Sequence, residues 1–251
     1  MTVEAQERLI VALDAPHDPS NPGRLIEMDD ARWLVDQLHG IVKFVKIGWP
    51  LYMASDRGHQ ALIDEFRARG MKVFLDLKFG DVAETVRRLV LAAVEDGVEF
   101  LTLNTTIDAL RAAVRARGSS SLKILTVTLL TNQDAGDLRE IGINMSVPEF
   151  VLWKAEREKQ KGGVDGVIAS GREAAALREK FGRDFLIVTP GIRPAGVSHH
   201  EQKRVATPAE AVTAGADYLV VGRPITQAPN PRDAAIRIIE EMQRGFDSLA
   251  G

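Results

Sequence analysis

Residues 72–81 read Lys72-Val73-Phe74-Leu75-Asp76-Leu77-Lys78-Phe79-Gly80-Asp81, with Thr85 four residues further on. Its apolar start is typical of a β-strand, and an amphipathic helical pattern follows over residues 82–94. Side chains two positions apart on a strand share a face, so Asp76 and Lys78 should project to the same side. Buried opposite charges are costly unless they pair. The stretch therefore predicts a strand–helix unit that carries either catalytic groups or a structural ion pair that fixes the loop.

The same alternation of short apolar runs and helical patterns continues along the whole chain. The predicted strands cover residues 9–13, 44–47, 73–77, 100–103, 124–128, 166–169, 185–188 and 218–221. The predicted helices cover residues 31–38, 60–69, 82–96, 107–117, 147–160, 172–181 and 207–214, and a long one begins near Pro231. Nearly continuous apolar strands between helices indicate a parallel sheet that is covered on both sides.

Eight strand–helix units in 251 residues predict an α/β protein, a (β/α)8 TIM barrel in which residues 1–251 form a single domain. A doubly wound open sheet is the alternative, but that fold usually carries a glycine-rich first turn. Here the first turn reads Asp14-Ala15-Pro16 and contains no glycine. Residues 17–23, rich in Pro, Asn and Asp, are expected to form a surface insertion.

The composition excludes several classes of function. Hydrophobic residues make up 45% of the chain and charged residues 27%, with a net charge of -3. No basic stripe indicates nucleic-acid binding, and no apolar run is long enough to cross a bilayer. The absence of cysteine excludes disulfides, thiolate nucleophiles and cysteine-ligated zinc. Because the first residues lack the pattern of a signal peptide, we expect a cytoplasmic protein.

Polar residues gather where the predicted strands end, which is where the active site of a TIM barrel lies. These residues are Asp14, Lys46, Asp76, Lys78, Thr131, the segment Pro190-Gly191-Ile192-Arg193, and Gly222-Arg223. A scatter of charges unrelated to function would not favour strand ends. Aspartate after a strand is also a common helix cap, however, so Asp14 taken alone is equally compatible with a structural role.

The loops after the seventh and eighth strands are predicted to bind phosphate, as these loops commonly do in barrels. Gly222 permits close backbone approach, and the guanidinium of Arg223 can hold two phosphate oxygens. Residues 195–204 could fold over a ligand as a lid and contribute Gln202. The alternative for Arg223 is that it is simply a solvated arginine at a turn and binds no phosphate. Adjacent residues in a loop rarely bind the same ion, so no metal site is predicted at His199 and His200.

Short segments spread over the chain from Leu9 to about Asn230 form one ordered signature. They read Val11-Ala12-Leu13-Asp14, Val45-Lys46-Ile47-Gly48, Leu75-Asp76-Leu77-Lys78-Phe79-Gly80-Asp81-Val82, Val188-Thr189-Pro190-Gly191-Ile192-Arg193-Pro194, Gln202-Lys203-Arg204 and Val221-Gly222-Arg223-Pro224-Ile225-Thr226. In this order and spacing they resemble the orotidine 5'-phosphate decarboxylase family, and its bacterial branch most closely. That family makes UMP in pyrimidine biosynthesis.

The resemblance implies a role for each matching position. The charged array at the reacting carbon matches Lys46, Asp76, Lys78 and Asp81. Lys78 would deliver a proton to C6 of the pyrimidine, and Asp76 would lie against the departing carboxylate. The substrate contacts match Asp14, Lys46, Thr85, Thr131, Pro190, Arg193, Gln202, Gly222 and Arg223. The resemblance also implies a homodimer in which Asp81 and Thr85 reach the neighbouring active site, and a reaction without metal or cofactor.

The chain departs from the family pattern in two places. Ala83-Glu84 stand where the family commonly has Pro-Asn before the threonine. After the fourth strand, Thr102-Leu103-Asn104-Thr105-Thr106 replaces the usual Asn-Val-His that precedes a small residue and a glycine pair. We therefore expect the charged array to be kept and the shape of these two loops to differ.

Two rival functions share some of these features. Magnesium-dependent barrels that act on sugar phosphates use the same D-x-K-x-x-D strand, but they place a glutamate where this chain has Lys46. A hard cation needs oxygen ligands, and a lysine repels it. A binding protein without catalytic activity would also keep the residues that bind phosphate, but it would not require every member of the charged array.

Overall fold

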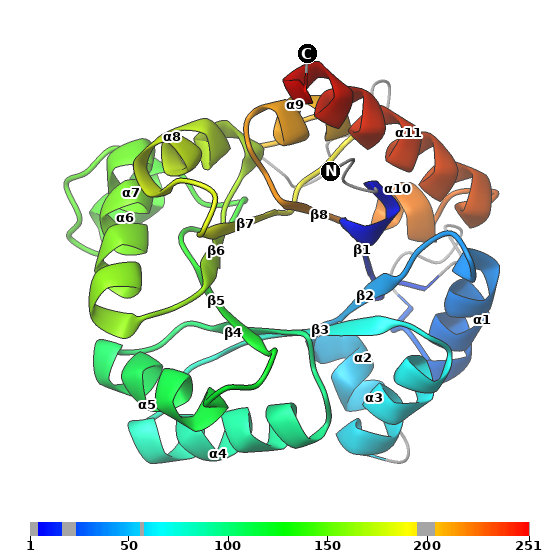
Figure 1. Cartoon of the computed structure of the whole chain (residues 1–251), viewed down its shortest axis with the longest axis horizontal. Helices are drawn as coiled ribbons and strands as arrows, with labels where there is room; N and C mark the ends of the chain where they lie inside the picture. Colours follow the sequence, from blue (N-terminus) through cyan, green and yellow to red (C-terminus); the bar gives the residue numbers. More distant parts are fainter. Residues whose placement is uncertain (1–4, 17–23, 56–57, 195–203, 251) are drawn as a thin grey trace.

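Parallel strands close into one barrel, and helices cover its outer surface (Figure 1). The computed structural model describes residues 5–16, 24–55, 58–194 and 204–250. The strands are β1 (Leu9–Ala12), β2 (Phe44–Ile47), β3 (Lys72–Phe79), β4 (Phe100–Leu103), β5 (Lys123–Val127), β6 (Gly166–Ile168), β7 (Leu186–Thr189) and β8 (Tyr218–Val221). Each pairs in parallel with the next, and β8 pairs with β1. The predicted (β/α)8 barrel is confirmed.

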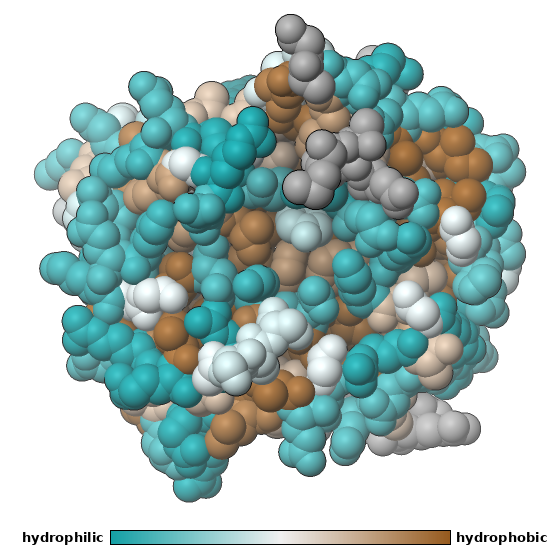
Figure 2. All heavy atoms as spheres, viewed as in Figure 1, coloured by the Kyte–Doolittle hydropathy of each residue, from teal (hydrophilic) through white to brown (hydrophobic). Residues whose placement is uncertain are grey.

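The outer ring of helices follows the predicted pattern. It consists of α1 (Met28–Leu38), α3 (His59–Ala68), α4 (Ala83–Glu95), α5 (Ile107–Arg117), α7 (Val147–Arg157), α8 (Gly171–Phe181), α9 (Pro208–Thr213) and α11 (Pro231–Ala250). Hydrophilic side chains cover much of the face seen in Figure 2. Beneath them, the apolar side of each helix packs against the outward side chains of the strands.

The helix predicted for residues 147–160 continues from α7 into the π-helical turn η2 (Glu158–Gly162). The other short elements were not predicted: the 3-10 turn η1 (Ala5–Glu7) and the helices α2 (Trp49–Ala54), α6 (Ala135–Glu140) and α10 (Arg223–Thr226). Each is too short to show a helical period in the sequence, and isolated helices of this length are unstable without tertiary contacts. Two of them follow directly after β2 and β8 and so border the carboxyl ends of the strands.

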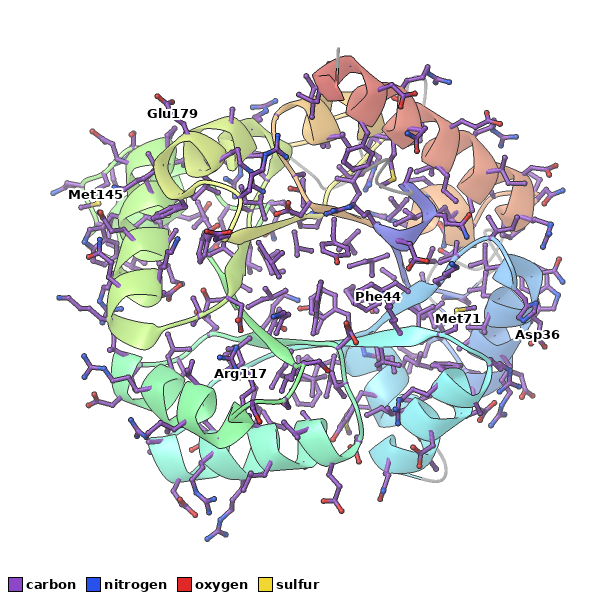
Figure 3. The ribbon with its side chains drawn as sticks, viewed as in Figure 1. Asp36, Phe44, Met71, Arg117, Met145 and Glu179 are labelled. Atoms are coloured by element: carbon purple, nitrogen blue, oxygen red, sulfur yellow. The ribbon has the colours of Figure 1, made fainter. Side chains whose placement is uncertain are left out.

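The inside of the barrel is filled by aromatic side chains near the amino ends of the strands. Phe44, Phe100 and Tyr218 meet edge to face, with ring centroids 4.9–6.0 Å apart. Phe74 contacts Phe100 in the same geometry at 5.9 Å. Figure 3 shows Phe44 pointing into the barrel, whereas Glu179 points outward from α8. This apolar plug leaves only the carboxyl ends of the strands open to a ligand.

Some predictions fall on residues outside the described ranges. These are the surface insertion at residues 17–23, most of the lid at residues 195–204, Gln202, His199 and His200. For the described part of the chain, no helix has the length and apolar character needed to cross a membrane.

The aromatic plug predicts a large loss of stability when Phe100 is truncated. Phe100→Ala should lower the free energy of unfolding by about 3–5 kcal/mol, because it removes a buried ring and leaves a cavity between its neighbours. Denaturant titration followed by circular dichroism measures this loss. Leu25→Ala serves as the control, since this exposed side chain should change stability by less than about 0.5 kcal/mol. Similar losses for both variants would contradict a packed barrel interior.

Candidate active site

A cavity of about 740 Å³ opens at the carboxyl ends of the strands. Its volume lies within the range of small-molecule sites. Residues predicted from the sequence make up much of its lining: Asp14, Lys46, Asp76, Lys78, Thr131, Pro190, Arg193, Gly222 and Arg223. The structure therefore brings together nearly all predicted site residues, which come from six different loops and strands. Asp81 and Thr85 do not line this cavity, and Gln202 lies outside the described residues.

One wall of the cavity is a row of alternating charges. The Lys46 ammonium lies 2.6 Å from Oδ2 of Asp14 and 3.2 Å from Oδ2 of Asp76. The same Asp76 oxygen lies 2.9 Å from the Lys78 ammonium. The order of charge along the row is thus negative, positive, negative, positive. Asp76 and Lys78 both face the cavity from β3, as the sequence predicts.

Burial and charge act in opposite directions on the two central members of this row. Burial raises the pKa of Asp76, but the two lysine ammonium groups and the hydrogen bonds outweigh it, so the net pKa is lowered. Burial likewise lowers the pKa of Lys46, whereas attraction by Asp14 and Asp76 raises it overall. Each buried charge is therefore held in its ionised form by its neighbours.

The two lysines differ in access to the cavity. The Lys46 side chain is 8% exposed and lies between two carboxylates, whereas the Lys78 side chain is 38% exposed. The row therefore contains one locked cation and one that is accessible to a ligand.

Thr102 belongs to the site, although the sequence analysis gave it no role. Its hydroxyl donates a hydrogen bond of 2.8 Å to Oδ1 of Asp76, the oxygen that the lysines do not use. A repeated pattern could have identified it: β2, β3 and β4 each carry Phe-x-polar, in Phe44-Val45-Lys46, Phe74-Leu75-Asp76 and Phe100-Leu101-Thr102. Because alternate residues share a face, each polar group stands one layer above the aromatic plug.

Gly48 is a second site residue without a predicted role of its own. A β-carbon at this position would lie 2.4 Å from Oδ1 of Asp14 and 3.2 Å from the Lys46 ammonium. The backbone of Gly48 is extended, so space rather than conformation requires a glycine. Its missing side chain lets Asp14 fold over the end of β2 and reach Lys46.

The lining of the cavity also includes two arginines and several apolar side chains. Arg193 and Arg223 both line it, as do Val127, Ile168 and Val220. Burial lowers the pKa of Arg193, and repulsion by the Arg223 guanidinium lowers it further. Among the described residues no carboxylate forms an ion pair with Arg223. Two like charges held close together favour an anionic ligand.

Asp81 is exposed in the loop that follows β3, and Thr85 is exposed in the first turn of α4. Oδ1 of Asp81 accepts a hydrogen bond of 2.6 Å from the backbone of Val82, and the described residues of this chain form no ion pair between Asp81 and Lys78. The divergent loop after β4 holds this segment in place. The hydroxyl of Thr105 donates to the carbonyl of Asp81 at 2.9 Å, and the backbone of Asn104 donates to Phe79 at 2.9 Å.

The second divergent position, Glu84, has a local role in helix α4. Its carboxylate accepts hydrogen bonds of 2.8 Å from Arg87 and 2.9 Å from Arg88, which lie one turn further along the helix. These bonds lower the pKa of Glu84 to about 2. The structure therefore shows a helix start stabilised by charge in place of the family's usual Pro-Asn.

Within the described ranges, no three His, Cys, Asp or Glu side chains converge in a way that could hold a metal ion. Between Asp14 and Asp76, where two carboxylates approach each other, the Lys46 ammonium lies instead. The fold and this wall of alternating charge define a (β/α)8-barrel enzyme whose site is built on the carboxyl ends of its strands.

Comparison with known proteins identifies the family. A profile of the Orotidine 5'-phosphate decarboxylase / HUMPS family matches residues 7–238. Proteins named orotidine 5'-phosphate decarboxylase are similar over most of their length. The one from Nitrobacter winogradskyi is 47% identical over 95% of this chain and 93% of its own, and the one from Methylobacterium sp. is 44% identical over 94% and 96%. This chain belongs to the Orotidine 5'-phosphate decarboxylase / HUMPS family.

Solved structures agree with this assignment. The crystal structure of orotidine 5'-phosphate decarboxylase from Lactobacillus acidophilus superimposes with a TM-score of 0.76 at 32% identity. The superposition covers 94% of this chain and 99% of that one. The resemblance stated from the sequence segments is therefore confirmed.

The contact between Gly48 and Asp14 predicts that a single methyl group damages the site. Gly48→Ala should lower kcat/KM by about 10-fold or more, because the new β-carbon displaces Asp14 from Lys46. Steady-state kinetics with orotidine 5'-phosphate measure the effect. In a chain that already carries Asp14→Ala, the same change should cost much less, since the clashing carboxylate is gone. Equal losses in both backgrounds would show that Gly48 acts in some other way.

Proposed function

We propose that this chain converts orotidine 5'-phosphate to UMP and carbon dioxide, a carboxy-lyase reaction of pyrimidine biosynthesis. The observation that carries the proposal is the row Asp14–Lys46–Asp76–Lys78 along one wall of the cavity. Relatives at 43–47% identity over nearly the whole chain are named for this activity. This row supplies the positive charge and the proton that decarboxylation requires.

Decarboxylation at C6 breaks the bond between C6 and the carboxylate carbon and leaves the electron pair on C6. No adjacent π-system absorbs this charge, so fixed positive charge must favour the developing anion. The accessible ammonium of Lys78 is suited to this task and then gives its proton to C6, which completes UMP. Lys78 recovers the proton from water.

The other members of the row hold Lys78 ready. Asp76 pairs with the ammonium at 2.9 Å and orients it. Asp76 would also lie against the substrate carboxylate that departs as carbon dioxide. The locked cation Lys46 keeps Asp76 ionised and, together with Asp14, is proposed to bind the ribose hydroxyls.

The arginine pair in the cavity suits the phosphate. Arg193 and Arg223 lie close enough to repel each other, and a phosphate dianion would relieve that repulsion. We assign Gln202 and the backbone at Gly222 to the same phosphate-binding site. Thr131 and Pro190, which also line the cavity, are proposed to contact the pyrimidine. Binding energy from the remote phosphate would thereby organise the reacting end.

A magnesium-dependent reaction on a sugar phosphate is the second candidate, because such barrels share the β3 motif. Its metal would need oxygen ligands around the position of Lys46. The ammonium of Lys46, 2.6 Å and 3.2 Å from two carboxylates, neutralises the groups that would hold a divalent cation. We therefore propose a reaction that needs neither metal nor cofactor.

The active protein is proposed to be a homodimer in the cytoplasm. Asp81 and Thr85 are exposed and do not line the cavity of their own chain, and the neighbouring Val82 is 68% exposed. A second copy that covers this surface would receive both polar groups at its own site. The row Asp14–Lys46–Asp76–Lys78 would then gain a third carboxylate, that of Asp81, from the second copy.

The reaction itself is the first test. Turnover of orotidine 5'-phosphate, followed by the loss of ultraviolet absorbance as UMP forms, should be insensitive to EDTA. Lys78→Ala should lower kcat by at least about 10²- to 10⁴-fold, which is the usual contribution of a positioned proton donor. A folded protein without this turnover, but with magnesium-dependent activity on sugar phosphates, would contradict the proposal.

Sharing of sites between subunits predicts complementation. Lys78→Ala and Asp81→Asn homodimers should each be nearly inactive, because every site lacks one group. A heterodimer purified with two different affinity tags contains one intact site out of two and should recover about half of the activity of the unaltered dimer. If Asp81 serves its own chain, the heterodimer will be as inactive as its parents.

A further inference from the structure

The peptide group between Leu77 and Lys78 lies where the pairing of β3 is interrupted. The register of β3 with β2 ends at Leu75. Its register with β4 passes from Leu75 opposite Leu101 directly to Phe79 opposite Leu103, so four steps on β3 face two steps on β4. An irregularity of this kind redirects side chains and leaves backbone groups to find other partners.

Lys78 also has an unusual backbone conformation. Its φ is +48°, and among the described residues it is the only one other than glycine with a positive φ. A side chain in this region strains the backbone, so the conformation persists only where the surroundings enforce it. Something in the structure must therefore hold the Leu77–Lys78 peptide in place.

Side chains from β4 and α2 form hydrogen bonds with both polar atoms of this peptide. On one side, the N–H of Lys78 donates a hydrogen bond of 3.0 Å to the hydroxyl oxygen of Thr102 on β4. On the other side, the carbonyl of Leu77 accepts a hydrogen bond of 2.8 Å from the indole N–H of Trp49 in α2. A peptide bond is planar, so these two contacts fix the orientation of the whole group.

The Thr102 hydroxyl connects this peptide to the charged row. It accepts from the backbone of Lys78 and donates its own hydrogen to Oδ1 of Asp76 at 2.8 Å. A hydroxyl offers one donor and two acceptor positions, and both kinds are used here. Thr102 is fully buried, so water cannot replace it. The backbone of Lys78 and the carboxylate that faces its ammonium are thus held by one atom.

We propose that Thr102 and Trp49 form a two-sided clamp on the Leu77–Lys78 peptide and are positioning residues for the reaction. The clamp holds the strained backbone from which the Lys78 ammonium reaches both Asp76 and the cavity. Valine at position 102 would keep the shape and lose both hydrogen bonds, and phenylalanine at position 49 would keep a ring and lose the N–H. The inference rests on the proposed function for its kinetic part only.

The clamp is tested with Thr102→Val, Thr102→Ser and Trp49→Phe. Thr102→Val should lower kcat by about 10- to 100-fold, the range expected when a reacting group is misplaced by about 1 Å. Binding of UMP, measured by calorimetry, should change by less than about 3-fold, because the phosphate end is untouched. Thr102→Ser should restore most of the activity, since it keeps the hydroxyl. Trp49→Phe should lower kcat in the same direction.

The pH profile separates positioning from mere stability. Loss of the hydrogen bond to Asp76 disfavours its charged form, so the acid limb of kcat should move to higher pH in Thr102→Val but not in Thr102→Ser. Thr128→Val and Trp153→Phe are matched controls. Thr128 is a buried threonine whose hydroxyl bonds to the carbonyl of Ile168, and Trp153 lies on α7. Both should leave kcat and the profile unchanged.

Crystal structures of Thr102→Val and Trp49→Phe test the clamp independently of any activity. In at least one of them the φ of Lys78 should leave the positive region, and its ammonium should separate from Asp76. Unchanged Lys78 geometry in both would overturn the clamp, as would kinetic losses matched by the controls. Absence of orotidine 5'-phosphate turnover in the unaltered protein would instead count against the proposed function, and the crystal structures would still decide the clamp.

Discussion

The Asp76 carboxylate is the group on which the rest of the site depends. One of its oxygens forms ion pairs with the ammonium groups of Lys46 and Lys78, and the other accepts a hydrogen bond from the hydroxyl of Thr102. A buried carboxylate without such partners would take up a proton, and the two lysines would then repel each other. Asp76 thereby sets the charge of its neighbours and the distance between them.

The barrel supplies this arrangement from a simple structural repeat. On β2, β3 and β4, an inward phenylalanine is followed two residues later by an inward polar residue, so an apolar layer supports a polar one. The apolar layer excludes water from below, which strengthens electrostatic interactions in the row above. Interruption of the β3–β4 pairing then turns the end of β3 so that Lys78 reaches the cavity.

Much of this could be predicted from the sequence, because alternating strand and helix patterns and polar strand ends are local signals. The barrel and the cavity positions of Asp14, Lys46, Asp76, Lys78 and Arg223 follow from them. Thr102, Gly48 and Trp49 were missed for a physical reason. Their importance arises from contacts with residues far away in the chain, and a glycine or a tryptophan alone carries no signal of such contacts. For Thr102, the repeated Phe-x-polar pattern marks its layer in the barrel but not its contact with the backbone of Lys78. Roles across a dimer interface are likewise invisible in a single chain.

The charged row is tested most directly by the pKa of the Asp76 carboxyl in the unliganded protein, measured by carbon NMR with aspartate labelled at the carboxyl carbon and assigned with Asp76→Asn. We expect a pKa below the ordinary aspartate value of about 3.9, because two ammonium groups and one hydroxyl favour the charged form. Its signal should therefore stay constant as the pH falls from 8 to about 5. Titration at or above the ordinary value would show that burial dominates and that the charged row is not formed before substrate binds.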